Sequence, residues 1–245
     1  MVGLAGAQGA GKSTAAAAVA GALAARGRRV AALSLDDLYL GRAARRALAA
    51  RAHPLFATRG PPGTHDVALG LDVLGALAAG RAVRLPRFDK AADEPRPAAA
   101  WPAAPAPADV VLFEGWCVGA RPEPDAALAR PVNALEAEED PDGRWRRAVN
   151  DALAGPYQAL WARVDVLAFL AAPGWAVVPG WRLEQEAALA AAVARRGGGG
   201  AGVMDAAGVA RFVQHFERVT RHMLAELPAR ADVVVRLDAR RGVAG

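Results

Sequence analysis

The first fourteen residues constrain the fold of this chain more than any other stretch. Gly6, Gly11, Lys12 and Ser13 match the spacing G-x-x-x-x-G-K-[ST], between a short apolar run and a helix-forming segment. Glycines in such a loop let backbone N–H groups point at phosphate oxygens, beside the positive end of the next helix. A chance Gly-rich turn is the alternative, but the strand, loop and helix signals occur together. The sequence therefore predicts a site for nucleotide phosphates.

The side chains of this loop have separate expected roles. Lys12 supplies a mobile charge for the β- and γ-phosphates, and Ser13 supplies a hydroxyl for Mg²⁺. The predicted nucleotide-binding residues are Gly6, Ala7, Gln8, Gly9, Ala10, Gly11, Lys12, Ser13 and Thr14. ATP and Mg²⁺ are therefore the expected cofactors.

Composition indicates a folded chain that binds small anions. Of its 245 residues, 53% are apolar and 22% are charged, which is enough to bury a sizeable core. The net charge of +5 favours anionic partners. No arginine cluster alternates with aromatic residues, so we expect no nucleic-acid partner. Only Lys12 and Lys90 are lysines, and in so Arg-rich a chain most single arginines carry little information.

Cysteine content and hydropathy favour a cytoplasmic protein without a membrane partner. Cys117 is the only cysteine, which rules out an internal disulfide and disfavours a cysteine metal site. No apolar run reaches the roughly 18 residues that a membrane span needs. A predicted strand follows Met1 at once, which leaves no room for a signal peptide unless an upstream segment is missing. The oligomeric state is not indicated.

Strand and helix signals alternate along the chain. Beyond the strand before residue 6, strands are predicted at 30–34, 109–116, 164–170 and 232–237, with a short one at 83–85. Helices are predicted at 12–26, 41–52, 67–79, 144–163, 182–196 and 208–226. This alternation is typical of an α/β fold with three α/β/α layers and a mostly parallel, five-stranded core sheet. We expect a single domain over residues 1–245.

Four segments depart from this regular pattern. Residues 91–108 are dense in Pro and Ala and are predicted to form an insertion loop rather than a domain linker. Four glycines at 197–200 predict a flexible break. The acidic run 136–142 is expected to be a solvated loop. Trp145 and Trp161 are expected in the core.

Acidic residues end two of the predicted strands. Glu114 ends the strand at 109–116, and Asp36 and Asp37 follow the strand at 30–34. Ligands of open α/β sheets bind at the carboxyl ends of the strands, so these acids are expected beside the phosphate loop. Ser13, Glu114 and Asp36 are the expected surroundings of Mg²⁺. The alternatives are an exposed strand-end glutamate and two ordinary N-cap aspartates.

These motifs resemble a known family. Residues 6–14, 34–39 and 113–116 are similar to those of P-loop small-molecule kinases, which include uridine kinase, pantothenate kinase and phosphoribulokinase. The more specific resemblance is to the D-glycerate 3-kinases of the plant, fungal and bacterial P-loop type. It rests on Arg59–Asp66, Pro86–Lys90, Trp181–Glu186 and Phe212–Arg221. The resemblance extends from Gly3 to about Arg241, and it also includes the stretch 133–157, for which no physical role is predicted.

The resemblance implies roles for particular residues. Asp36 corresponds to the catalytic acid, which positions or deprotonates the acceptor hydroxyl, and Tyr39 to a position that lines the acceptor site. Residues from about 175 to 202 correspond to a helical lid that closes over the phosphates, in which Arg182 reaches the transferring phosphoryl group. An i,i+4 pair with Glu186 on a solvated helix is the alternative role for Arg182.

A glycerate site needs a cation for the acceptor carboxylate. Arg59 and Arg87 are the stronger candidates, because a guanidinium grips a carboxylate with two parallel hydrogen bonds. Lys90 and His65 are the others, although each charge taken singly is also typical of a surface. His65 with Asp66 is also suited to cap the next helix. The predicted substrate-binding residues are Asp37, Tyr39, Arg59, His65, Asp66, Arg87 and Lys90.

The resemblance implies transfer of the γ-phosphoryl group of ATP to the 3-hydroxyl of D-glycerate. Lys12, Asp36, Glu114 and Arg182 are the expected catalytic residues. A related kinase acting on pantothenate or a nucleoside is the first alternative. A regulatory P-loop NTPase is the second alternative. It would need a guanine-reading Asn-Lys-x-Asp segment, which the sequence lacks, and an Asp-x-x-Gly segment at the end of the strand 109–116, where the sequence instead has Glu-Gly-Trp.

Overall fold

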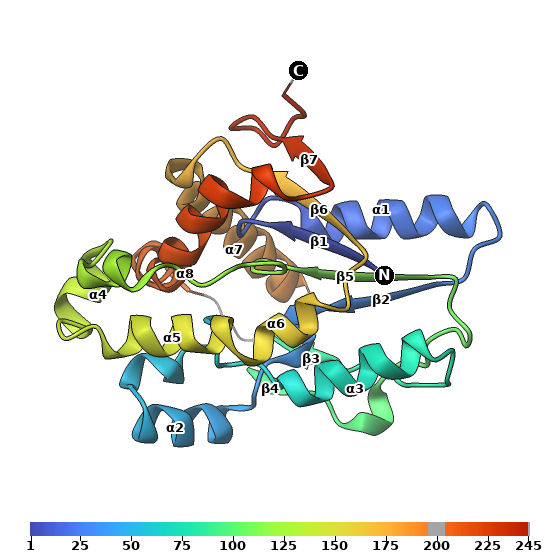
Figure 1. Ribbon diagram of the computed structural model, residues 1–245, viewed down its shortest axis with the longest axis horizontal. Coiled ribbons are helices and arrows are strands. Elements are labelled where there is room, and N and C mark those ends of the chain that lie inside the picture. Colours follow the sequence, from blue (N-terminus) through green and yellow to red (C-terminus); the bar gives the residue numbers. More distant parts are fainter. Residues whose placement is uncertain (196–203, 245) are drawn as a thin grey trace.

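The computed structural model describes residues 1–195 and 204–244, in which strands and helices alternate (Figure 1). The strands are β1 Val2–Gly6, β2 Val30–Ser34, β3 Phe88–Asp89, β4 Glu94–Pro95, β5 Val110–Gly115, β6 Val166–Ala171 and β7 Val233–Arg236. The α-helices are α1 Lys12–Ala24, α2 Arg42–Arg51, α3 Val67–Ala78, α4 Ala134–Glu139, α5 Arg144–Ala154, α6 Pro156–Trp161, α7 Val178–Arg195 and α8 Ala206–Glu226. Short 3₁₀ turns include Leu35–Leu38 and Pro54–Ala57.

A parallel sheet forms the middle layer of the fold. Its five strands are ordered β2-β5-β1-β6-β7, and all four pairings are parallel. Helix α1 lies on one side of the sheet, and α3 and α6 lie on the other (Figure 1). In the register, Glu114 is level with Ser34 of β2 and Leu4 of β1, so the carboxyl ends of these three strands meet at one edge. The predicted α/β fold with five core strands is confirmed.

The segment 83–108 differs from its prediction. Residues 83–85 form no strand. They make an isolated antiparallel bridge, Arg84 with Ala103, because Pro86 and Pro102 lack the N–H groups that a longer ladder needs. The predicted insertion loop is largely irregular but contains β4, which pairs with β3 as a short antiparallel hairpin. This hairpin, residues 88–95, lies at the edge of the candidate site.

The predicted helix 144–163 is two helices. Helix α5 ends before Gly155, and α6 begins with Pro156 in its first turn, because proline lacks an N–H for a continuing helix but suits a helix start. Helix α7 begins at Val178, four residues before the predicted start. The ends of the remaining predicted elements agree to about two residues. The predicted break 197–200 and the end of the predicted helix 182–196 lie outside the described residues.

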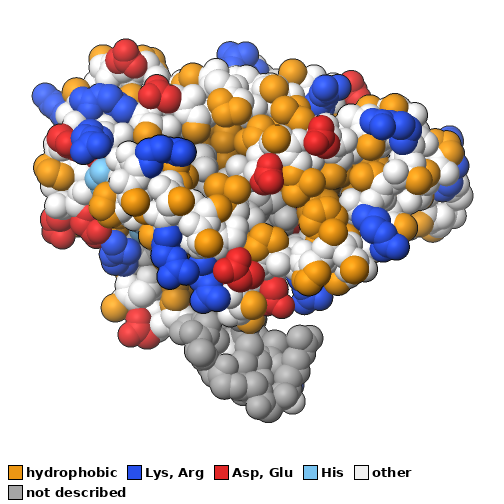
Figure 2. Space-filling model, turned by 90° about the horizontal axis from the view of Figure 1, so that it is seen from below, with side chains coloured by type: hydrophobic (Ala, Val, Ile, Leu, Met, Phe, Trp, Pro, Cys, Tyr) orange, Lys and Arg blue, Asp and Glu red, His pale blue; other side chains and the backbone are white. Residues whose placement is uncertain are grey.

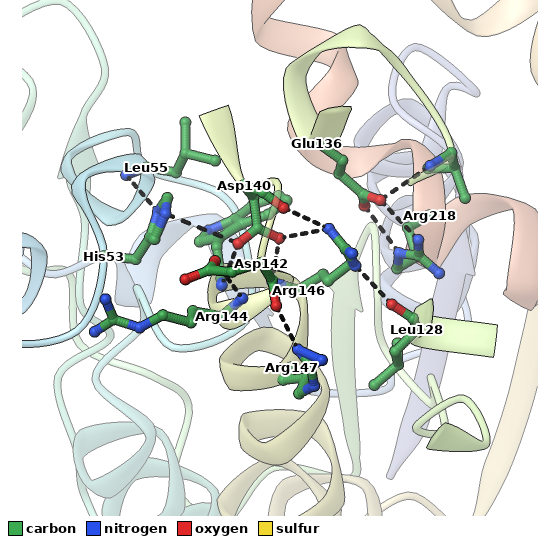
Figure 3. Close-up of polar contacts among 12 residues, drawn as sticks. His53, Leu55, Leu128, Glu136, Asp140, Asp142, Arg144, Arg146, Arg147 and Arg218 are labelled. Carbon is green, nitrogen blue, oxygen red and sulfur yellow. Dashed lines mark hydrogen bonds and ion pairs between the residues drawn. The ribbon is translucent and has the colours of Figure 1, made fainter. Parts of the chain in front are cut away.

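A buried ion network joins α4, α5 and α8 (Figure 3). The carboxylate of Glu136 accepts from Arg218 Nε at 2.8 Å and Nη2 at 2.6 Å, and Glu136 is 0% exposed. Asp140, also 0% exposed, accepts from Arg146 Nη1 at 3.0 Å and from the backbone N–H of Trp145 at 2.7 Å. The prediction that the acidic run 136–142 is solvated holds for the exposed Glu138, Glu139 and Asp142 but is wrong for Glu136 and Asp140. Arg218, 82 residues away, encloses Glu136, and the first turn of α5 encloses Asp140.

The two tryptophans expected in the core lie there, and charged side chains of both signs lie on the surface (Figure 2). Trp145 and Trp161 are buried in the main core, as predicted. On the side of the molecule where α2 and α3 lie, Lys and Arg side chains are scattered among acidic and apolar ones (Figure 2). None of the described helices combines the length and the apolar character that crossing a bilayer requires.

Candidate active site

The phosphate loop connects β1 to α1 as predicted. Gly9 and Gly11 adopt left-handed backbone conformations with φ of 77° and 86°, and Lys12 is the first residue of α1. The ammonium of Lys12 donates to the carbonyl of Ala7 at 3.0 Å, back across the loop. Burial lowers the pKa of Lys12, an effect that the nearby carboxylates of Glu114 and Asp36 oppose. The carboxyl end of β1, the N-terminus of α1 and the ammonium of Lys12 therefore lie together at this loop.

Helix α7 packs directly on this loop. A Cβ atom at Gly9 would lie 2.5 Å from Cβ of Trp181, so glycine is required there for close approach as well as for its positive φ. The indole of Trp181 donates to the carbonyl of Ala239, and the guanidinium of Arg241 stacks on that indole and donates to the carbonyl of Gly9. The predicted lid segment and the chain end after β7 thus both contact the phosphate loop.

Ser13 and Glu114 are joined across the site. The Ser13 hydroxyl donates to Glu114 Oε1 at 2.9 Å, although 101 residues separate them. Among the residues that the structure describes, no group of three or more His, Cys, Asp or Glu side chains is placed to hold a metal ion. Mg²⁺ in kinases is held by one or two protein groups together with phosphates and waters. The Ser13–Glu114 pair suits such a magnesium site.

Asp36 is the most strongly paired acid in the cavity. Tyr39 donates its hydroxyl to Oδ1 at 2.8 Å, and Lys90 donates to Oδ2 at 2.6 Å. Burial alone raises the pKa of Asp36, but Lys90 and Tyr39 outweigh it and hold the pKa well below the usual value. Asp36 raises the pKa of Lys90, and burial raises that of the Tyr39 phenol. Asp36 is therefore ionised and Lys90 charged at neutral pH.

Asp37 and Arg87 hold the hairpin in place. Asp37 accepts from the backbone N–H of Phe88 at 3.0 Å and from Arg87 Nη1 at 3.3 Å. Burial raises the pKa of Asp37, although these two donors oppose it. Neither residue lines the cavity, so the predicted contacts of Asp37 and Arg87 with the substrate stay predictions, and their observed contacts are with the protein.

The segment 59–66 delivers Arg59 to the cavity. A Cβ atom at Gly60 would lie 2.2 Å from Cζ of Phe216 in α8, and φ at Gly60 is 126°, so only glycine fits this close packing. Arg59 lines the cavity and donates to Asp93 at 2.5 Å. The loop is thus held against α8 while its arginine faces the site.

His65 and Asp66 lie beside the site rather than in it. Asp66 caps α3, its carboxylate accepting from the N–H of Leu69 at 2.9 Å. His65 is buried, stacks on Tyr39 with ring centroids 4.7 Å apart, and pairs through Nδ1 with the Tyr157 hydroxyl at 2.5 Å. Burial lowers the pKa of His65 to about 3, so it is neutral at physiological pH. His65 therefore supports the Tyr39 ring, and its predicted contact with the acceptor stays a prediction.

Arg182 fits both predicted alternatives. It pairs with Glu186 at 2.6 Å, one turn along α7, and its guanidinium stacks on Phe212 of α8 at 5.3 Å. It also lines the cavity. The pair does not lie on a solvated face, because the Glu186 side chain is 3% exposed. Glu186 thus holds Arg182 at the wall of the cavity, and the predicted contact of Arg182 with the transferring phosphoryl group stays a prediction.

One cavity brings most of these side chains together. Its lining residues are Gln8, Gly9, Lys12, Ser13, Asp36, Tyr39, Arg59, Lys90, Glu114, Trp116, Arg182, Gln185 and Phe212. Sequence reasoning did not assign Trp116, Gln185 and Phe212 to the site, although each lies in a segment that carries the resemblance. It also missed Asp93, for which the available signal was the charged group Asp93, Glu94 and Arg96 within a Pro- and Ala-rich stretch.

Comparison with known sequences relates the chain to kinases. No protein-family model matches it. The uncharacterized kinase mug58 of Schizosaccharomyces pombe is 34% identical over 235 residues, which cover 88% of this chain and 78% of that protein. The chloroplastic D-glycerate 3-kinase of Arabidopsis thaliana is 28% identical over 245 residues, covering 95% of this chain and 50% of the relative. This chain therefore spans half the length of the plant protein.

Comparison with solved structures gives the same fold. D-glycerate 3-kinase from Cryptococcus neoformans superposes with a TM-score of 0.79 at 24% identity, over 100% of this chain and 87% of that one. Phosphoribulokinase from Rhodobacter sphaeroides superposes with a TM-score of 0.51 at 11% identity, over 97% of this chain and 70% of that one. At these identities the superpositions show a shared fold.

Proposed function

Because this chain belongs to the P-loop kinases, as its similarity to the Schizosaccharomyces kinase shows, we propose that it phosphorylates D-glycerate at the 3-hydroxyl. ATP is the donor, and 3-phosphoglycerate and ADP are the products. The observation that carries the proposal is that one cavity is lined by Lys12 and Ser13 of the phosphate loop, by Asp36, and by Arg59 and Lys90. Lys12 and Ser13 suit the phosphates of ATP, and Arg59 and Lys90 are cations suited to an acceptor carboxylate. The names of two relatives, D-glycerate 3-kinases, support the choice of acceptor.

The phosphate side stabilises charge on the transferring group. The bond from the γ-phosphorus to the bridging oxygen breaks while a bond to the acceptor oxygen forms, with little covalent help from the protein. Lys12 and Arg182 place positive charge around this group, and backbone N–H groups of the loop hold the other phosphates. Ser13 and Glu114 would hold Mg²⁺, which neutralises charge between the β- and γ-phosphates when bound.

Asp36 orients the acceptor hydroxyl. With its pKa held low by Lys90 and Tyr39, it is a weak base in this arrangement and a good hydrogen-bond acceptor. A loose transition state needs the hydroxyl in line with the γ-phosphorus more than it needs early deprotonation. The hydroxyl proton leaves to Asp36 or to water as the new P–O bond forms.

Lys90 links the acceptor to Asp36. It donates to Asp36 at 2.6 Å, and its side chain is half exposed, so a second carboxylate can reach the same ammonium. An anionic acceptor is thereby drawn to the side of Asp36, where its hydroxyl can take the place of one of the present donors. An uncharged alcohol lacks this attraction, which favours glycerate over a nucleoside.

An acceptor panel tests the proposal. ADP release is measured with D-glycerate, pantothenate, uridine and ribulose 5-phosphate, and ³¹P NMR locates the new phosphate. We expect turnover with D-glycerate, with the phosphate on the 3-oxygen, and none with Lys12→Met. Turnover with pantothenate or uridine alone would assign a different acceptor. ATP hydrolysis without any acceptor dependence would instead indicate a regulatory NTPase.

The cytoplasmic location expected from the sequence belongs to this proposal and rests on cysteine usage. Cys117 is free and buried. The Arabidopsis relative is described as chloroplastic, so kinase activity does not fix the location, and the location needs a test of its own. Fractionation of the source cells checks it directly.

A further inference from the structure

Arg45 is a buried charge that the proposed reaction leaves unexplained. It lies on α2, is 1% exposed, and is the largest of the fully buried side chains. Taking a guanidinium out of water is costly unless its hydrogen bonds are well matched. Within the described part of the chain its side chain bonds only to Asp93, through Nη1 at 3.2 Å and through Nη2. Its Nε has no hydrogen-bond partner there.

Asp93 shares its carboxylate between two arginines. It lies in the turn between β3 and β4, where its Oδ1 accepts from Arg59 Nη1 at 2.5 Å as well as from Arg45. Its φ of 56° is left-handed, a conformation that aspartate tolerates better than most residues. Burial alone raises the pKa of Asp93, but hydrogen bonds from Arg45 and Arg59 outweigh it and lower the pKa. The carboxylate is therefore ionised.

Of the three linked charges, Arg45, Asp93 and Arg59, it is Arg59 that lines the cavity. Its side chain is 20% exposed, and its guanidinium lies 5.9 Å from the centre of the Phe88 ring. Among the described residues its side chain makes one hydrogen bond, through Nη1 to Asp93. The Nη2 and Nε donors are thus left for a ligand, and the direction of the fork is set by Asp93 and Phe88.

The balance of charge depends on Arg45. Asp93 paired with Arg59 alone would form a neutral pair, which attracts an anion weakly. With Arg45 on the far side of the carboxylate, the three groups carry one net positive charge, and its outer end is Arg59. Because buried charges are screened only weakly, the net charge of these three groups affects the binding of an anion in the cavity.

We propose that Arg45 and Asp93 are positioning residues that hold Arg59 aimed into the cavity and keep it able to bind the carboxylate of the acceptor. The inference rests on the proposed function in taking the acceptor to be a carboxylate. Arg45 and Asp93 act through Arg59. They tie α2 and the hairpin 88–95 to the segment that begins at Arg59, so three elements together set the acceptor site.

Kinetics of Arg45→Met test the proposal against a purely structural role. The KM for D-glycerate should rise about tenfold, the effect of weakening one charge-assisted hydrogen bond, while the KM for ATP stays within about twofold. Arg45→Lys restores the charge and should recover part of the loss. Arg46→Met, an exposed neighbour on the same helix, is the matched control and should leave both constants unchanged. Equal rises in both constants, or a lower melting temperature with both KM values unchanged, would overturn the proposal.

A second measurement separates this inference from the proposed function. If the wild-type protein does not phosphorylate D-glycerate, the proposed function fails, and Arg59 is then followed directly by ¹⁵N NMR of its Nε–H group, assigned with Arg59→Met. Arg45→Met should shift this signal, because Asp93, the carboxylate that holds Arg59, loses its other arginine, and Arg46→Met should not. A signal unchanged by Arg45→Met would refute the positioning role whatever the acceptor.

Discussion

Two clusters of charge in this molecule are built from the same residue types and differ in what their charges face. In the buried ion network, Arg218 meets the carboxylate of Glu136 (Figure 3). It also donates to the carboxylate of Glu123 and to the carbonyls of Ala127 and Arg130. Every one of these partners belongs to the protein. In the cavity, Lys12, Lys90 and Arg59 each donate a hydrogen bond to one protein group, and all three line the open space.

The number of donors that an arginine uses on protein groups distinguishes arginines expected to stabilise the fold from those expected to bind a ligand. A guanidinium has five N–H donors, and Arg218 uses all three of its nitrogens on protein acceptors, so none remains for a ligand. Arg59 uses one nitrogen and Arg182 pairs with one carboxylate, and both line the cavity. Removing a charge should therefore lower stability in the network and lower activity in the cavity.

Arg218→Met is the strongest challenge to this division. It leaves Glu136 buried without its cation, which should lower the free energy of unfolding by about 3–5 kcal/mol in urea titrations. Arg221→Met is the matched control. Its side chain is 54% exposed and pairs with Glu217 on the same helix, so it should cost under about 1 kcal/mol. The KM for ATP should stay unchanged in both folded variants. Equal stability losses would show that the network is no stronger than a surface pair.

Lys12→Met should do the reverse. Within residues 1–195 and 204–244, Lys12 donates only to a loop carbonyl, so its loss should change the free energy of unfolding by less than about 1 kcal/mol. The kcat should fall on the order of 10²–10³-fold, equivalent to about 2.7–4 kcal/mol, because a charge that stabilises the transferring phosphoryl group is lost. Urea titration and ADP release on the same preparation check both. A retained kcat would remove Lys12 from the catalytic set.

The pH dependence of the free energy of unfolding should depend on two histidines, His65 beside the cavity and His215 beside the buried ion network. Burial lowers the pKa of His65 to about 3 and that of His215, next to Trp145, to about 4, from 6.5. The unfolded chain takes up protons first as the pH falls through 6.5, so stability is complete above that pH and is lost below it. Each histidine should cost about 2 kcal/mol at pH 5 relative to pH 7.5.

Urea titrations at these two pH values measure this loss. His215→Gln should remove about half of the pH dependence, because His65 continues to contribute. Carboxylates with lowered pKa values, such as Asp93, contribute only below about pH 4 and leave this window clear. A full pH dependence in the variant would mean that His215 is not the group that titrates.

The smallest expected effect is on the KM for D-glycerate and distinguishes Arg59 from Arg87. The sequence placed Arg59 and Arg87 on an equal footing as carboxylate ligands, whereas only Arg59 lines the cavity and Arg87 is engaged with Asp37. Arg59→Met should raise the KM for D-glycerate about tenfold, or about 1.4 kcal/mol, and Arg87→Met by less than about twofold. Steady-state kinetics of both variants at saturating ATP decide this. A larger effect of Arg87→Met would return it to the substrate site.

The parts predicted from sequence are those that local patterns determine. The phosphate loop follows from glycine conformation and helix start within a few residues, and the strands ending at Ser34 and Glu114 follow from buried apolar runs. The fold and the phosphate half of the site were therefore predictable. The sheet register then brings Ser13 and Glu114 together without a further signal in the sequence.

The parts missed depend on partners far apart in the chain. Glu136 looks like a solvated acid until Arg218, 82 residues later, encloses it. Asp93 lies in a segment whose prolines and alanines indicate a loop, and its role comes from Arg45 and Arg59, each more than 30 residues away. Propensity describes such residues as exposed loop charges, and only tertiary packing shows that both are paired and that Glu136 is buried.

The two lysines of the chain, Lys12 and Lys90, line the same cavity as Asp36. Apart from the amino terminus, every primary amine of the protein is thus in one place. An amine-directed acylating or fluorescent reagent becomes a titrant of the active site, and nucleotide or acceptor should protect one lysine each. Occupancy of both halves is then countable by mass spectrometry of two peptides, without any measurement of turnover.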